Sequence, residues 1–433
     1  MRAAVAEEAV LRHTLGNGLR VVIAEERSAP VAGVAVHYGV GFRSEAEGRS
    51  GFAHLFEHLM FQGGAGTRDD HFRQVEGAGG FCNASTRQDY TDFYDVVPAE
   101  ALEHVLALEA ARMREPKITQ RAVRAQASVV REEVLGKLRR PYGGFPWPRL
   151  SPVLFRTFAN AHDGYGDHAA LEGVTVAECA EFFDRRYSPS NAVLTVAGDV
   201  DAQRTLDAVE RLFGSIPARP APAAVSFWEP EPRGVAEGGY ADPLAPLPAV
   251  AVGHRVPDPA TAPRAHIALS VLASILAANA ASRLPERIRR DHGQAVTVTA
   301  RAGLFDLLDA RDPDMWILTA VHPGELDRGH VLDALDAEMR SIAAAGPAPG
   351  ELLRARLRQR TSHHRSLDHL ANRVRMLGRF ELLYGDPGLA TRLPALFDET
   401  TAEEVARAAL GLRAGSRAVL TLTPGTRQEG GPR

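Results

Sequence analysis

Residues 51–63 read GFAHLFEHLMFQG, and this stretch decides the fold. It places His54, Glu57 and His58 in a largely apolar segment, which is typical of a buried helix. Positions i and i+4 lie on one face of a helix, so both imidazoles would point the same way and could bind one metal ion. Glu57 would then be near enough to take a proton from a water molecule at that metal. The stretch therefore predicts a metal-dependent site on a buried helix.

The order of the three residues is the reverse of the His-Glu-x-x-His helix of many zinc proteases. A catalytic zinc ion needs a third protein ligand and an open fourth position. Two imidazoles and a carboxylate suit zinc, but they do not exclude manganese or cobalt. The alternative is an ordinary buried helix face. That alternative is costly, because polar side chains in apolar surroundings need partners or a metal. We therefore expect one Zn²⁺ per chain.

Composition indicates a globular chain of two or more domains, with 433 residues, 45% apolar and 24% charged. The net charge of −4 demands no large basic surface and disfavours nucleic acid as a partner. Cys82 and Cys179 form no disulfide framework. Neither has a cysteine or histidine at the spacing of a zinc finger, so both are predicted to be buried or half-buried thiols.

The N-terminus lacks the basic and then apolar pattern of a signal segment. The longest apolar stretch, residues 266–282, is interrupted by polar residues and is too short to span a membrane. We therefore expect no membrane span and a cytoplasmic location, or a periplasmic or secreted one if a leader has been removed.

The rest of the chain alternates strand and helix patterns. Residues 11–25 predict a hairpin around an Asn-Gly turn, and residues 119–140 predict a helix that begins at Thr119. The sequence VAV of residues 250–252 repeats residues 34–36, and VLTL at residues 419–422 is similar to VLTV at residues 193–196. These similarities predict a tandem duplication.

The predicted fold is α+β, with two similar α/β-sandwich halves. We place an N-terminal metal-bearing domain at residues 1–216, a proline-rich linker at 217–236 and a C-terminal domain at 237–433. The histidine motif has no counterpart in the second half. Chemistry is therefore expected in the first half, and the second half is expected to help bind substrate.

The third ligand should be a carboxylate on a separate helix. Glu132 and Glu133 are both candidates, since the predicted helix of residues 119–140 has an apolar stripe beside them. Two glutamates on a solvated helix surface are the alternative, and the pattern of residues alone does not decide.

The motif HLFEH, followed 75 residues after His58 by Glu133 in VVREEV, resembles the pitrilysin/insulinase family of zinc peptidases. The resemblance extends over nearly the whole chain and is strongest to the bacterial subfamily related to mitochondrial processing peptidase. In that family the glutamate of a Val-Val-x-x-Glu segment is the third ligand, which implies Glu133. A supporting glutamate seven residues earlier corresponds to Gln126 here, which still forms hydrogen bonds but brings no charge.

The segment GGFCNASTRQDYTDFY, residues 79–94, resembles the strand of this family that binds substrate. The resemblance implies that Asn83, Ala84 and Ser85 bind an extended peptide. In the second half, residues 282–296 resemble a segment in which an arginine and a tyrosine, seven residues apart, hold the substrate backbone. Arg289 matches the arginine, but Val296 stands at the tyrosine position.

The missing tyrosine suggests a division of labour between two chains. Members of this subfamily are two-domain chains that pair into a closed, clam-like chamber. The resemblance therefore implies a homologous partner subunit that supplies the Arg-Tyr pair, in a heterodimer, with a homodimer as the alternative.

The leading hypothesis is a zinc metallo-endopeptidase in which His54, His58 and Glu133 bind Zn²⁺ and Glu57 is the general base. The alternative is a non-catalytic or weakly active interaction subunit of the same fold, although such relatives usually lose the histidine motif. An oxidoreductase with a carboxylate-bridged metal pair fits poorly, because it needs a Glu-x-x-His motif twice. The loose group of His363, His364 and His369 could bind a metal, but a solvated helix face is the favoured interpretation. His71 is treated as an ordinary core or surface residue.

Overall fold

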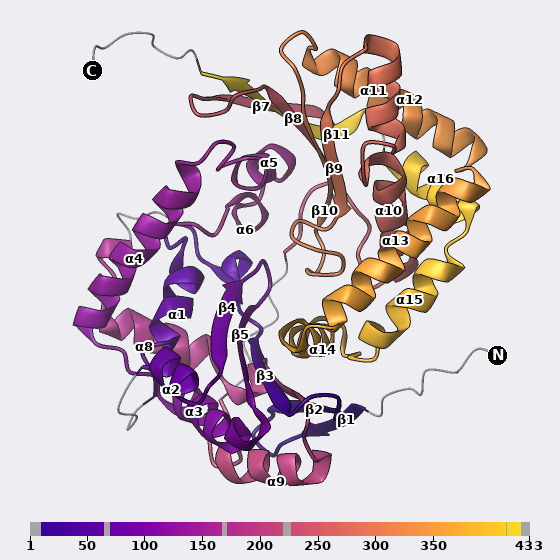
Figure 1. Cartoon of the computed structure of the whole chain (residues 1–433). Coiled ribbons are helices and arrows are strands. Elements are labelled where there is room, and N and C mark those ends of the chain that lie inside the picture. Colours follow the sequence, from indigo (N-terminus) through magenta and orange to yellow (C-terminus); the bar gives the residue numbers. More distant parts are fainter. Residues whose placement is uncertain (1–9, 65–69, 167–170, 220–226, 413, 426–433) are drawn as a thin grey trace, which may run out of the picture. The chain divides into compact units, whose positions relative to one another are not determined.

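The computed structural model describes residues 10–64, 70–166, 171–219, 227–412 and 414–425. These residues form two compact units, each built from one β-sheet and its covering helices (Figure 1). The first unit comprises Met1–Arg131, Gly164–Ser226 and His363–Leu393, and the second comprises Glu132–Asp163, Phe227–Ser362 and Pro394–Arg433.

The sheet of the first unit has six strands in the order β1-β2-β6-β3-β5-β4. β2 and β6 are parallel, and the other neighbours are antiparallel. The predicted hairpin around Asn17 and Gly18 joins β1 to β2 and is confirmed; Gly18 has a φ of 89°, which favours glycine. The strands are β1 Val10–Thr14, β2 Arg20–Glu25, β3 Val31–Tyr38, β4 Phe81–Thr86, β5 Thr91–Pro98 and β6 Ala192–Gly198.

Helices cover both faces of this sheet. Asp92 and Asp95 of β5 are an odd number of residues apart, so their side chains point to opposite faces. Asp92 meets Arg375 of α14, and Asp95 meets His71 of α2. Helices α1, α2 and α3 therefore lie on one face and α14 on the other. The helices are α1 Phe52–Met60, α2 His71–Gly77, α3 Leu102–Arg114, α4 Gln120–Leu138, α8 Val176–Arg186, α9 Ala202–Phe213 and α14 Leu370–Tyr384.

The sheet of the second unit repeats this topology, with strands in the order β7-β11-β8-β10-β9. β7 and β11 are parallel, as β2 and β6 are, and the remaining pairs are antiparallel. β8 and β11 contain the two repeated segments and occupy the positions of β3 and β6, which confirms two halves of similar design. The strands are β7 Gly234–Asp242, β8 Ala249–Arg255, β9 Thr297–Ala302, β10 Met315–Val321 and β11 Ser416–Pro424.

Most of the apolar stretch of residues 266–282 lies on α10, which is buried along most of its length. In the part of the chain that is described, no helix combines the length and the apolar character needed to cross a membrane. The remaining helices are α5 Trp147–Leu154, α6 Phe158–Ala161, α10 Pro263–Ala277, α11 Arg283–His292, α12 Arg328–Ala345, α13 Pro349–Leu367, α15 Leu389–Glu399 and α16 Ala402–Gly411.

The two compact units differ from the contiguous domains predicted at residues 1–216 and 237–433. Each sheet is apolar on both faces, and its second face is covered by a helix from the other half of the chain: α14 packs on β3 and β6, and α5 packs on β7, β8 and β11. The sequence prediction is corrected for these two segments, since a helix belongs to the sheet whose apolar surface it buries. The predicted linker ends earlier than residue 236, because β7 begins at Gly234.

The close approach of α14 to the sheet depends on Gly378. A Cβ atom at this position would lie 2.5 Å from His37 Nδ1 and 2.7 Å from Thr195 Oγ1, both on buried strands. We therefore expect Gly378→Ala to destabilise the chain by about 1–3 kcal/mol through overpacking, although alanine favours a helix.

Gly136→Ala is the matched control, because Gly136 is exposed on α4 and a Cβ there meets nothing within 4 Å. It should be neutral or stabilising by up to about 1 kcal/mol. Urea denaturation of both variants measures the difference, and an unchanged midpoint for Gly378→Ala would contradict the packing described.

Candidate metal centre

Helix α1 is fixed at its N-terminus by a carboxylate. Glu45 accepts hydrogen bonds from the backbone N–H groups of Gly51 and Ala53, both at 2.8 Å. These bonds satisfy helix donors that have no intrahelical partner and place a negative charge at the positive end of the helix. The helix also buries its own apolar side chains, which are Leu55, Phe56, Leu59 and Met60. The helix is therefore held rigidly, and its two histidines have defined positions.

The structure brings the three predicted ligands together. His54 and His58 have ring centroids 5.1 Å apart, and one ligand atom from each of His54, His58 and Glu133 lies within 4.8 Å of the other two. Glu133 lies on α4, a continuous helix that starts within the first unit, and the division between the units falls two residues before it. Glu132, the other candidate, is exposed.

This donor set fits a zinc ion. Two imidazole nitrogens and one carboxylate oxygen are the ligands of several catalytic zinc sites, and they leave a fourth position open. His54 is buried, while His58 and Glu133 are half-buried, so the site is accessible from one side. Lys137 donates a hydrogen bond of 2.6 Å to Glu133 Oε1 from the next turn of α4. That bond helps to orient the carboxylate.

Gln126 lies where the resemblance places it. Its Oε1 atom is 3.3 Å from His58 Nδ1, and it is on α4 two turns before Glu133. When His58 Nδ1–H donates to this amide oxygen, the lone pair of Nε2 is left for a metal ion. Gln126 therefore sets the tautomer of one predicted ligand without bringing a charge.

The predicted general base has a partner that the sequence did not single out. Thr86 Oγ1 donates a hydrogen bond of 2.5 Å to Glu57 Oε2, from the last residue of β4. A charge-assisted bond of this length restricts the carboxylate to one orientation. The only signal in the sequence is that Thr86 follows the predicted substrate segment, and the contact itself depends on the packing of α1 against β4.

Strand β4 forms the edge of the six-stranded sheet, where its one neighbour among the described strands is β5. Asn83 is exposed, and its Oδ1 atom accepts a hydrogen bond from the N–H of Ala84 at 2.8 Å. Ser85 Oγ accepts a hydrogen bond of 2.9 Å from Arg375 of α14. Because side chains alternate along a strand, Ser85 points away from the face that carries Thr86. Binding of substrate by Asn83, Ala84 and Ser85 stays a prediction, and for Ser85 the main chain is the available part.

Arg375 also pairs with a buried carboxylate behind this edge. Its Nε atom donates to Asp92 Oδ2 at 2.5 Å, and Asp92 is fully buried. Burial alone would raise the pKa of Asp92, but the Arg375 guanidinium outweighs it and holds that pKa below its usual value. The pair is therefore ionised at neutral pH and fastens α14 to the β4–β5 hairpin.

Arg289 lies in the second unit. It is on α11, where its guanidinium forms an exposed ion pair with Glu286 of the same helix. Val296, at the position where the family has a tyrosine, is half-buried just before β9. The role predicted for Arg289 in substrate binding stays a prediction.

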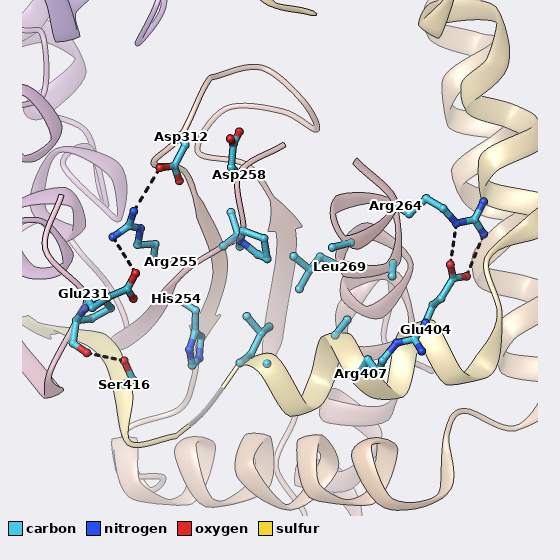
Figure 2. A pocket seen from close by; sticks show the side chains of 18 residues that line it. Glu231, His254, Arg255, Asp258, Arg264, Leu269, Asp312, Glu404, Arg407 and Ser416 are labelled. Atoms are coloured by element: carbon cyan, nitrogen blue, oxygen red, sulfur yellow. Dashed lines mark hydrogen bonds and ion pairs between the residues drawn. The ribbon is translucent and has the colours of Figure 1, made fainter. Parts of the chain in front are cut away.

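The second unit also has a pocket of about 910 Å³ that is lined by the end of β8, the start of β11 and helices α10 and α16 (Figure 2). Its charged side chains pair with each other, as Arg255 does with Asp312 at 3.3 Å and Arg264 with Glu404 at 2.8 Å. Within the described residues it contains no group of metal-ligating side chains. The candidate metal centre is therefore in α1 and α4.

Both cysteines are buried free thiols, as predicted. Cys82, however, lies beside His71 and Asp95 in a second group of possible ligand atoms, which the spacing of residues along the chain did not reveal. In the loose histidine group, His363 is buried and bonds Ala390 O at 2.6 Å, so it is not part of the solvated face that was expected.

Comparison with known proteins places these features in a family. The model of the insulinase family (peptidase family M16) matches residues 20–136, and that of the peptidase M16 inactive domain matches residues 173–358. The first match contains every predicted metal ligand. The second covers much of the half that lacks the motif.

Similar proteins are found in several bacteria and in a plant. An uncharacterized zinc protease of Mycobacterium leprae is 30% identical over 405 residues, which cover 92% of this chain and 87% of that protein. The probable beta subunit of the mitochondrial-processing peptidase of Arabidopsis thaliana is 24% identical over 208 residues, covering 48% of this chain and 39% of that protein. A crystal structure of a protease from Helicobacter pylori has the same fold, with a TM-score of 0.86 and 23% identity over 96% of this chain and all of that chain. On these grounds the chain belongs to the insulinase family, peptidase family M16.

Proposed function

We propose that this chain is a zinc metallo-endopeptidase. The observation that carries the proposal is the convergence of ligand atoms from His54, His58 and Glu133, within 4.8 Å of one another. His54 and His58 lie on α1, which also bears Glu57, and Glu133 lies on α4. Two imidazoles and one carboxylate are a donor set of catalytic zinc. A relative that is 30% identical over most of its length is named a zinc protease, which supports the same activity here.

In this mechanism Zn²⁺, when bound, supplies a Lewis acid that lowers the pKa of water and polarises the scissile carbonyl. Glu57 takes the proton from the attacking water and later delivers it to the leaving amine. Thr86 holds the Glu57 carboxylate in one orientation, since its hydroxyl donates to Oε2. Gln126 is placed to accept a hydrogen bond from His58 Nδ1–H, which would leave Nε2 of His58 to hold the metal.

An extended peptide would bind by pairing with β4. The strand lies at the edge of the sheet, and its last residue contacts the proposed base. Backbone hydrogen bonds from β4 would align the peptide as an added strand without reading its sequence. We therefore propose an endopeptidase of loose sequence specificity, whose substrates are extended peptides.

A homologous partner subunit is the second part of the proposal. Val296 cannot donate the hydrogen bond that a tyrosine would supply to the substrate. One similar protein is named as a subunit of a mitochondrial-processing peptidase, which supports pairing here. A non-catalytic role is the competing outcome, because the second half matches a model described as an inactive domain.

The first test measures zinc content and peptide cleavage by the purified chain, alone and as Glu57→Gln. We expect about one zinc ion at this centre in both forms. Cleavage of a quenched-fluorescent peptide library should fall by at least about 10²- to 10⁴-fold in Glu57→Gln, because the base is lost. Zinc binding without cleavage by the isolated chain would support the need for a partner. Undiminished cleavage by Glu57→Gln would exclude it as the base.

The third ligand is tested by comparing two adjacent glutamates. Glu133→Gln should weaken zinc binding by more than the roughly 10- to 100-fold that is typical of losing an outer hydrogen-bonding partner. Glu132→Gln is the matched control on the same helix, and it should leave the dissociation constant unchanged because Glu132 is exposed. Competition with a chelating indicator gives both constants. Equal losses in the two variants would remove Glu133 from the metal centre.

The role of Thr86 is tested by the pair Thr86→Val and Thr86→Ser. Loss of a hydrogen bond to a charged group should lower kcat by about 10- to 100-fold in Thr86→Val, with little change in KM. Thr86→Ser retains a hydroxyl and should recover most of the rate. If the two variants were equally slow, the hydroxyl would not be what positions Glu57.

A further inference from the structure

A second group of ligand atoms lies in the first unit, away from the surface. His71 is the first residue of α2, Cys82 is on β4 and Asp95 is on β5. One ligand atom from each lies within 4.8 Å of the other two. Only 1% of His71, 9% of Cys82 and none of Asp95 is exposed. A nitrogen, a sulfur and a carboxylate oxygen therefore converge in a buried site.

The register of the hairpin creates this convergence. Cys82 and Asp95 are directly opposite each other in the antiparallel pair of β4 and β5, so their side chains project to the same face. His71 Nε2 lies 2.7 Å from Asp95 Oδ1 on that face. The three side chains come from two strands and a helix that packs on them, and their backbones are held by the sheet. The site is thus built by the fold and does not depend on a mobile loop.

The aspartate has an oxygen available for a further interaction. Asp95 Oδ2 is fully buried and has no hydrogen-bond partner among the described residues. Buried carboxylate oxygens are normally satisfied, because leaving one without a partner is unfavourable. A metal ion bound by Asp95, Cys82 and His71 would satisfy it.

The charges of the neighbouring residues favour a cation as well. Glu109 forms a buried ion pair with Arg112, and Glu109 Oε1 lies 3.9 Å from His71 Nε2. The carboxylates of Asp95 and Glu109 outnumber the one guanidinium. Asp95, Glu109 and a Cys82 thiolate would carry three negative charges. Arg112 and a divalent cation would carry three positive charges, so the cluster would be neutral.

The histidine already faces the aspartate through one ring nitrogen. His71 Nε2 and Asp95 Oδ1 are 2.7 Å apart, and a metal ion bound by both would replace the proton of this hydrogen bond. Nitrogen, thiolate and carboxylate ligands in a closed site suit zinc, and structural zinc sites have four protein ligands. Glu109 is the nearest candidate for the fourth.

We infer that His71, Cys82 and Asp95 form a second, structural zinc site that ties α2 to the β4–β5 hairpin. The site is distinct from the proposed centre of His54, His58 and Glu133 and does not depend on peptidase activity. It would stabilise β4 from the face opposite Ser85 and Arg375. With Glu109 as the fourth ligand the ion would have no open position, so the site would supply no chemistry.

Cobalt substitution tests this site selectively, because a thiolate bound to Co²⁺ gives a charge-transfer band in the near ultraviolet and the His-His-Glu centre has no sulfur. The full chain is produced in cells grown with cobalt, so that the buried site is loaded during folding. We expect the band in the unmodified chain. Cys82→Ser should abolish it, and Cys179→Ser, which changes the other buried thiol, should leave it unchanged.

Zinc stoichiometry supplies the second measurement. Chain produced with zinc should contain about two ions, and both Cys82→Ser and the double variant His54→Ala/His58→Ala should contain about one. The cobalt band must persist in the double variant, which separates this site from the proposed catalytic centre. Absence of the band from the unmodified cobalt-loaded chain would overturn the inference, whatever the variants do. A band that survives Cys82→Ser would also overturn it.

Discussion

The alternation of side chains along the β4–β5 hairpin is the constraint on which the rest of the first unit depends. Residues that are an odd number of positions apart on one strand must point to opposite faces of the sheet. Asp92 therefore meets Arg375 of α14 on one face, and Asp95 meets His71 of α2 on the other. Both carboxylates are fully buried, so each needs its partner. A shift of β5 by one residue would move Asp92 and Asp95 to the opposite faces of the sheet, away from these partners.

The same hairpin connects the covering helices to the proposed chemistry. Thr86, at the end of β4, bonds the carboxylate of Glu57 on α1. The outer edge of β4 is where an extended peptide would pair. Substrate alignment, the orientation of the base and the packing of the unit thus rely on one pair of strands. Removal of a partner from the buried pair of Asp92 and Arg375 would be expected to disturb the site, although neither residue contacts the metal ligands in the contacts described here.

Duplication of the fold has produced two similar halves, and one of them bears the predicted metal ligands. Both units have the same strand topology, and each sheet is covered on its second face by a helix that originates in the other half of the chain. This exchange makes the halves interdependent, because a half expressed alone would leave one apolar sheet face uncovered. Only the first half of the sequence contains His54, His58 and Glu133. The second half keeps its fold without the histidine motif.

The sequence by itself determined the features that follow from local periodicity or from the family resemblance. The i, i+4 spacing of His54 and His58 places them on one helix face, the repeated strand segments predict the duplication, and the resemblance singles out Glu133 and Gln126. Only the tertiary structure decided the contact between Thr86 and Glu57, the exchange of α5 and α14, and the grouping of Cys82 with His71. These depend on strand register and helix packing between residues far apart in the chain or on different elements, and no short-range pattern in the sequence encodes them.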